Sequence, residues 1–287
     1  MHDLRDRREF LRLGLGVAAA VASARVAGLA RTARAQQFAT KSLNVRQLRE
    51  GLYQLEGAAS NMLMFDHRAA RLMVDSGTAD NGAELSLIIS QRLGGAPVGV
   101  LLNTHWHPDH TGGNDLLGRG GAKIIAHEST RLWMSTEYYV DWEDTTYKPR
   151  ESAALPTRTF YATDPQPIVA KIGDEEIEYG HLPEAHTDGD IYVWFKNRNV
   201  LAAGGVVTHG SYPVIDYATG GWIGGLVDAT RELLALTYAA TLIGPAGRPP
   251  GAAGGSRPRG SARPTRACSP RTVRPCSPRG AATAACT

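Results

Sequence analysis

The chain has 287 residues, of which 43% are hydrophobic and 21% charged, a composition typical of one large or two small globular domains. Its net charge of +3 arises at the ends. Residues 1–35 hold seven basic and three acidic side chains, and residues 248–287 hold eight basic side chains and no acidic one. Residues 36–247 hold 16 basic and 25 acidic side chains, a net charge of −9. An acidic central part argues against nucleic acid as a partner of the folded domain.

The first segment has the layout of an export signal. Arg7-Arg8 followed by Phe10-Leu11 resembles the twin-arginine signal, and a weakly apolar run leads to a small-residue cleavage site at residues 33–35. The apolar run is rich in alanine and interrupted by arginine, so we expect no stable membrane span. We expect residues 1–35 to be a twin-arginine-like signal peptide that directs the protein to the periplasm. The alternative is a basic N-terminal helix on a cytosolic protein.

Residues 36–247 read as one domain of short strands mixed with amphipathic helices. Alternating or continuous apolar runs predict strands over 51–57, 60–66, 71–77, 98–104, 122–127, 176–185, 191–195, 199–205 and 241–244. Helical spacing predicts helices over 81–95, 128–135 and 225–239, with a short one near 115–117, and residues 138–157 read as a polar surface excursion or lid. Strands and helices without strict βαβ alternation predict an α+β fold of two packed sheets with helices outside.

The last segment, residues 248–287, differs in composition from the rest. It contains eight arginines, seven prolines, no lysine and no acidic residue, and aliphatic side chains larger than alanine are nearly absent, so we expect no core there. A basic arm and a solvated, disordered tail are two interpretations. We favour a third, a frameshift product of a GC-rich gene. All three cysteines (Cys268, Cys276, Cys286) lie in this tail, so no cysteine can bind a metal in the central domain.

The stretch "NTHWHPDHTGGN", residues 103–114, has the spacing of a metal site. Side chains two apart in an extended segment point the same way, so His105 and His107 can bind one ion. Pro108 then bends the chain, which directs Asp109 and His110 towards a second ion. Glycines at 112 and 113 permit close backbone approach. Imidazole and carboxylate ligands without sulfur suit zinc first, with iron or manganese as alternatives.

The "HWHPDH" motif is similar to the signature of the metallo-β-lactamase-fold hydrolase superfamily. "MVDSG" resembles the strand that ends in an aspartate beneath the metals, here Asp75, and "EAHTDGD" resembles the segment that presents a third histidine, here His186. The resemblance covers about residues 45–245 and implies an αββα four-layer sandwich. It also implies a first metal on His105, His107 and His186, and a second on Asp109 and His110.

Two positions depart from the family pattern. The family has a bridging aspartate after the hairpin, where this chain has Gly205 in "AAGGVV", and a late Pro-Gly-His segment, where this chain has "IGPAGRPPG" without histidine. His209 lies close enough in sequence to be a substitute ligand, although a wall or surface histidine is the simpler interpretation. We therefore expect one tightly bound metal, a weak or absent second one, and a chain that lacks the family's normal C-terminal end.

The resemblance implies an exported zinc-dependent hydrolase. Zinc on three histidines keeps an open position where bound water ionises, and the hydroxide attacks a carbonyl-type small molecule such as a β-lactam, lactone or thioester. Asp109 is the expected catalytic residue, orienting the water or taking its proton. The alternative is a catalytically impaired remnant that binds metal or ligand without turnover.

Overall fold

The structure is a computed structural model that describes residues 42–92, 94–140, 144–164, 167–209, 212–238 and 241–244. The expected signal peptide, the expected tail and the "PAGRPPG" segment lie outside these residues. Within the described ranges, every helix is too short or too polar to cross a bilayer.

The larger sheet has seven strands, and its two halves differ in direction. From β1 to β4 the neighbours pair antiparallel, whereas β4, β5, β6 and β9 pair parallel. The parallel half places the carboxyl ends of β4 and β5 side by side, which is where Asp75 and the histidine motif begin. The strands are β1 (Asn44–Arg49), β2 (Leu52–Ala58), β3 (Ser60–His67), β4 (Ala70–Val74), β5 (Val100–Leu102), β6 (Lys123–His127) and β9 (Arg158–Phe160).

The smaller sheet has five strands in sequential order. Its first four strands are antiparallel, and the last pairs parallel with its neighbour. Every residue of β12 is buried, as expected for its continuous run "IYVWF" in the middle of the sheet. The strands are β10 (Ile168–Ile172), β11 (Glu175–His181), β12 (Ile191–Phe195), β13 (Val200–Ala202) and β14 (Leu242–Gly244).

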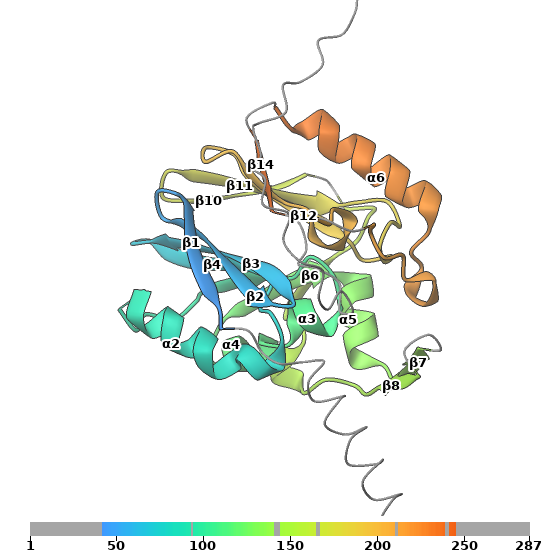
Figure 1. Cartoon of the computed structure of the whole chain (residues 1–287), viewed down its shortest axis with the longest axis horizontal. Coiled ribbons are helices and arrows are strands. Elements are labelled where there is room, and N and C mark those ends of the chain that lie inside the picture. Colours follow the sequence, from blue (N-terminus) through green and yellow to red (C-terminus); the bar gives the residue numbers. More distant parts are fainter. Residues whose placement is uncertain are drawn as a thin grey trace, which may run out of the picture. The chain divides into compact units, whose positions relative to one another are not determined.

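The two sheets pack face to face, and helices cover their outer faces (Figure 1). Phe65 of the larger sheet and Phe195 of the smaller one, both fully buried, lie in one hydrophobic cluster between them, with ring centroids 5.8 Å apart. On the outside of the larger sheet, Leu85 and Leu117 pack against methionines of β3 and β4. The helices that carry them are α2 (Gly82–Arg92) and α4 (Asn114–Arg119).

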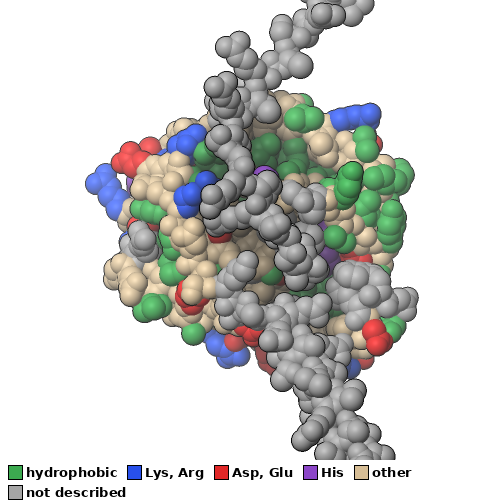
Figure 2. Space-filling view, viewed as in Figure 1, with side chains coloured by type: hydrophobic (Ala, Val, Ile, Leu, Met, Phe, Trp, Pro, Cys, Tyr) green, Lys and Arg blue, Asp and Glu red, His purple; other side chains and the backbone are tan. Residues whose placement is uncertain are grey.

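The outer face of the smaller sheet is covered by α6 (Ile223–Leu236). Leu226, Ala229 and Leu233 recur at helical spacing and pack against this sheet. Side chains on the opposite side of α6, among them Ile223 and Leu234, stay exposed, and hydrophobic side chains gather there at the right of the space-filling view (Figure 2). Helix, sheet, sheet and helix form the expected αββα sandwich.

The remaining elements surround the motif. The polar excursion predicted over 138–157 contains a small hairpin of β7 (Tyr138–Val140) and β8 (Thr145–Tyr147). The strands β1, β7, β8, β9 and β10 were not predicted, because each is short or largely polar. The other helices are α3 (Pro108–Thr111), α5 (Glu128–Ser135) and the 3-10 turns η1 (Ala79–Asn81), η3 (Ser152–Ala154), η4 (Gly204–Val206) and η5 (Tyr217–Thr219).

Candidate metal centre

The histidine motif is anchored to the end of β4. β5 ends at Leu102, and the chain bends over residues 104–106 instead of staying extended as predicted. Asp75 causes this bend, because its carboxylate accepts hydrogen bonds from the backbone N–H of Thr104 at 2.8 Å and from its hydroxyl at 2.8 Å. Asp75 has a φ of 60°, in the left-handed region that aspartate tolerates better than most residues. It therefore lies beneath the motif, where the resemblance implies it.

The glycines after the motif allow close packing, although not at the metal position. A side-chain carbon on Gly112 would lie 2.3 Å from the backbone nitrogen of Ala79, and one on Gly113 would lie 2.5 Å from the carbonyl oxygen of Ser76. The predicted close approach is thus between the motif helix and the segment that follows Asp75. It fixes the end of α3 against the segment that follows β4 and leaves the histidines to be placed by their own hydrogen bonds.

His186 comes from the other sheet, in the loop between β11 and β12. Asp190 shapes this loop, because its buried carboxylate accepts the backbone N–H groups of His186 at 2.7 Å and Thr187 at 2.8 Å, and the Thr187 hydroxyl at 2.9 Å. The "HTDGD" sequence thus forms a tight turn around its last aspartate. The turn directs the His186 ring towards the motif.

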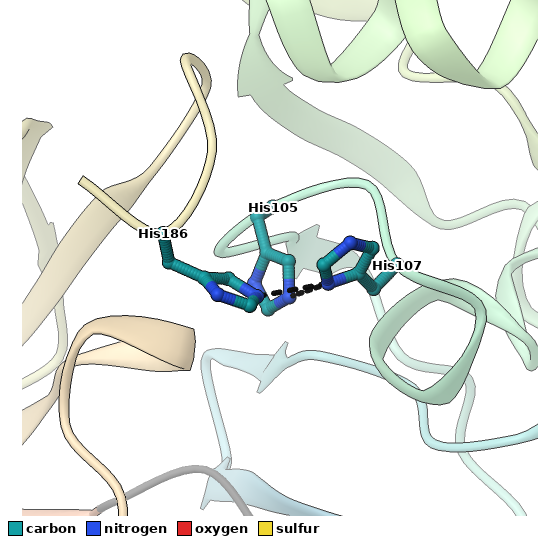
Figure 3. A group of neighbouring side chains, drawn as sticks. All are labelled: His105, His107 and His186. Atoms are coloured by element: carbon teal, nitrogen blue, oxygen red, sulfur yellow. Dashed lines mark hydrogen bonds between the residues drawn. The ribbon is translucent and has the colours of Figure 1, made fainter. Parts of the chain in front are cut away.

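The three histidines meet at one point (Figure 3). His107 Nδ1 lies 3.1 Å from His105 Nε2 and 2.8 Å from His186 Nε2. Among the described residues, these three form the one group of candidate ligands whose atoms all lie within 4.8 Å of one another. The structure therefore brings together the three residues expected to hold the first metal.

The partners of the outward ring nitrogens assign the three tautomers. His186 Nδ1 faces the carbonyl oxygen of Val214 at 2.6 Å, and His107 Nε2 faces a carboxylate oxygen of Asp216 at 3.0 Å, so both nitrogens must donate. His105 Nδ1 lies 3.0 Å from the hydroxyl oxygen of Thr104, whose hydrogen already goes to Asp75, so this nitrogen donates as well. In neutral rings with these tautomers, the three inward nitrogens each present a lone pair.

Three lone pairs that face one point suit a cation. Burial lowers the pKa of His105 well below its usual value, with further lowering by the neighbouring histidines. Burial also lowers the pKa of His107, and its hydrogen bond with Asp216 opposes this only in part, so that the value is about 4. Both rings are thus neutral at pH 7, as a metal ligand must be. Three imidazole nitrogens without sulfur fit zinc, and they also fit iron.

The second expected site is less developed. The His110 ring lies under the motif and donates from Nδ1 to Asp75 at 2.7 Å, while its Nε2 lies 3.7 Å from a carboxylate oxygen of Asp109. Burial by itself lowers the pKa of His110, but Asp109 and Asp75 outweigh it and raise the value to about 9. At neutral pH the ring is therefore protonated between two carboxylates.

The positions that the family uses to complete the second site supply no ligand here. Gly205 has no side chain, and a carbon added to it would lie 2.1 Å from Cδ2 of His186, so the His186 ring already fills that space. His209 is exposed and lies outside the group of converging ligand atoms. Asp109 and His110 thus stand without the partners they would have in a complete two-metal site.

Sequence reasoning missed Asp216, which holds the outer nitrogen of His107. Its side chain is 1% exposed, and it lies 109 residues after His107 in the segment before α6. No spacing links two residues so distant. The one local cue is an aspartate before "YATG", where Asp216 caps η5 by accepting the backbone N–H of Ala218 at 3.1 Å.

The chain resembles known proteins in sequence and in fold. The family model of the Metallo-beta-lactamase superfamily matches residues 55–257. A metallo-beta-lactamase from Pontibacter korlensis superposes with a TM-score of 0.57 and 19% sequence identity, over 72% of this chain and 92% of that one. The DIM-1 metallo-beta-lactamase superposes with a TM-score of 0.53 and 17% identity, over 71% and 90%. Identities this low support the fold alone, whereas the sequence match covers most of the chain. This sequence match, together with the αββα fold and the three converging histidines, shows that the protein belongs to the metallo-β-lactamase superfamily.

Proposed function

We propose that this protein is a hydrolase that holds one divalent metal ion tightly, zinc in the first place, and acts on a small molecule with a carbonyl-type centre. β-Lactams, lactones and thioesters are the candidate substrates. The observation that carries the proposal is the convergence of one ring nitrogen from each of three histidines, His105, His107 and His186. Zinc on three imidazoles supplies a Lewis acid with an open coordination position.

The chain's own groups have separate tasks in this proposal. His105, His107 and His186 bind the ion, and their outward nitrogens fix the ring orientations. Asp109 has a side chain that is one-third exposed, so its carboxylate can reach solvent, whereas His105 and His110 are buried. We assign it to orient the attacking water and accept its proton.

A second candidate function has one observation in its favour. The His186 ring occupies the space beside Gly205, which leaves no room for a bridging carboxylate between two metals. A chain that binds one metal but has lost efficient turnover fits this arrangement. Such a protein would bind metal or a small ligand without hydrolysing it.

Metal analysis and a substrate panel separate the two functions. The protein, purified with its native metal, is analysed for metal content and assayed with a chromogenic β-lactam, a lactone and a thioester. We expect about one tightly held metal per chain and hydrolysis of at least one substrate class, with both lost in His186→Ala. The matched control is His67→Ala, because His67 lies at the far end of β3 from the motif.

Each outcome decides between the candidates. One retained metal with no turnover of any substrate supports the impaired protein. A chain that retains no metal overturns the metal-dependent hydrolase and the metal-binding form of the impaired protein. Two equally tight metals would show that another residue, His209 first, completes the second site, and would restore a two-metal mechanism.

A further inference from the structure

A chain of buried hydrogen bonds runs from Trp106 to the back of His107. The indole N–H of Trp106 donates to the hydroxyl oxygen of Thr219 at 3.1 Å. The Thr219 hydroxyl donates to Asp216 Oδ2 at 2.7 Å, and His107 Nε2 donates to the same oxygen at 3.0 Å. Trp106, Thr219 and Asp216 are 3%, 0% and 1% exposed, so water does not compete for these groups.

The direction of each bond in this chain is fixed by chemistry. An indole nitrogen can only donate, so the Thr219 oxygen must accept from Trp106 and its own hydrogen is available to Asp216. A carboxylate can only accept, so His107 must carry its proton on Nε2. With that tautomer, Nδ1 of His107 has a lone pair, and this is the nitrogen that lies near His105 and His186. The bonds behind the ring therefore select the form that can bind a metal.

The same indole connects the site to the β7–β8 hairpin. Trp106 packs edge-on against the His107 ring, with centroids 4.3 Å apart. It also packs against Tyr138 and Tyr147, with ring centroids 5.0 and 5.3 Å away, and the two tyrosines stack on each other. The hairpin thus holds the indole in the position from which its N–H reaches Thr219.

We propose that Trp106 and Thr219 are positioning residues that fix the Asp216 carboxylate and thereby hold His107 in its metal-binding tautomer. The inference rests on the proposed metal centre and adds a cause for its affinity. A threonine or tryptophan with a purely structural role would affect folding stability but would leave the tautomer of His107 and the metal affinity unchanged.

The test compares isosteric variants of the full domain. Thr219→Val removes the hydroxyl with little change in shape, Thr219→Ser keeps it, and Trp106→Phe keeps an aromatic ring but removes the N–H. Thr230→Val is the matched control, because the Thr230 hydroxyl donates to the Leu226 carbonyl within α6 at 2.7 Å, away from the motif. Zinc affinity is measured by competition with a chelating dye, and the His107 tautomer by nitrogen-15 NMR of the metal-free protein.

We expect Thr219→Val to lower zinc affinity by about 10- to 100-fold, the range seen when groups that support metal ligands are removed. The His107 ring should then show both tautomers. Trp106→Phe should act in the same direction with a smaller effect, and Thr219→Ser and Thr230→Val should stay within twofold of the wild type. The double variant Trp106→Phe/Thr219→Val should be no weaker than Thr219→Val alone, because the indole acts through the hydroxyl.

Three results would overturn the proposal. The first is a Thr219→Val protein that binds zinc within twofold of the wild type, and the second is an unchanged His107 tautomer in it. If Thr219→Val does not fold, Trp106→Phe decides alone. The third overturning result is then a Trp106→Phe protein that binds zinc as tightly as the wild type. A wild type that binds no zinc would instead refute the metal centre itself, so the two failures remain distinguishable.

Discussion

Asp75→Asn tests whether one buried carboxylate organises the motif. Asparagine has the shape of aspartate and tolerates the φ of 60° at this position, so the backbone can stay in place. The native carboxylate accepts three hydrogen bonds, from the N–H and hydroxyl of Thr104 and from Nδ1 of His110. An amide offers only one oxygen. In one orientation this oxygen accepts from the Thr104 N–H, and the new NH₂ group then faces the donating Nδ1 of His110. In the flipped orientation the oxygen faces His110, and the NH₂ group faces the Thr104 N–H.

Either orientation leaves a buried donor without an acceptor and removes a hydrogen bond to a charged group. Each loss of this kind costs about 1.5–3 kcal/mol. Because His110 and Asp75 are both 3% exposed, solvent cannot compensate. We therefore expect Asp75→Asn to lower the free energy of unfolding by about 2–3 kcal/mol. For a domain of this size the melting temperature should fall by roughly 4–12 °C.

Urea unfolding of the metal-free protein, followed by circular dichroism at pH 7, measures this loss without a contribution from metal binding. Asp66→Asn is the matched control, because the carboxylate of Asp66 pairs with Arg71 at 3.0 Å in a partly exposed position, where an ion pair contributes about 0–1 kcal/mol. The reasoning is refuted if the two variants lose the same free energy, or if Asp75→Asn loses less than about 0.5 kcal/mol.

Two further variants test the packing and the pH response. Gly205→Ala should displace the His186 ring, lower the free energy of unfolding by about 1–3 kcal/mol and weaken zinc binding at least tenfold. The control is Gly99→Ala, whose added carbon has only ordinary contacts and which should change neither stability nor zinc affinity. Unchanged zinc affinity in Gly205→Ala would contradict the close fit of the His186 ring against Gly205. Burial lowers the pKa of His127 to about 4. Between pH 6.5 and 4 the unfolded chain therefore binds a proton that the folded chain does not, so the free energy of unfolding should decrease as the pH is lowered, by up to about 1.4 kcal/mol per pH unit. Urea unfolding of the metal-free protein from pH 4 to 8 measures this dependence. His127→Asn, which can still cap α5, should lose this pH dependence, and the control His67→Asn should keep it. If stability changes with pH equally in His127→Asn and the wild type, burial does not hold the His127 ring neutral.

Much of the fold was predictable because its signals are local. The helix over residues 128–135 was predicted with its observed bounds, because the spacing of apolar residues changes there from strand to helix. The structure adds that His127 caps this helix. The helix predicted over 225–239 is found over Ile223–Leu236, shifted by two or three residues at each end. β9 and β10 escaped prediction because strands of only three to five residues gain their order from their neighbours in the sheet.

The candidate site divides in the same way. His105 and His107 follow from spacing within one motif, and His186 followed from a resemblance in the "HTDGD" segment. Asp216 and Thr219 could not be predicted, because their role depends on a contact across 109 residues of chain. The fit between Gly205 and His186 was also hidden, since the sequence shows an absent carboxylate but not the ring that fills its place.

The origin of the three ligands has a consequence for the lifetime of the protein. His107 follows a strand of one sheet and His186, 79 residues later, lies between two strands of the other. An ion bound to both is a cross-link that ties the sheets together at one edge. Because the ion binds the folded chain and not the unfolded one, it stabilises the fold by about 2.7 kcal/mol when the free metal concentration is about 100 times the dissociation constant. If the site holds such an ion, its loss should favour opening at that edge and expose the protein to proteases, and we then expect the metal supply to set how long a folded copy survives.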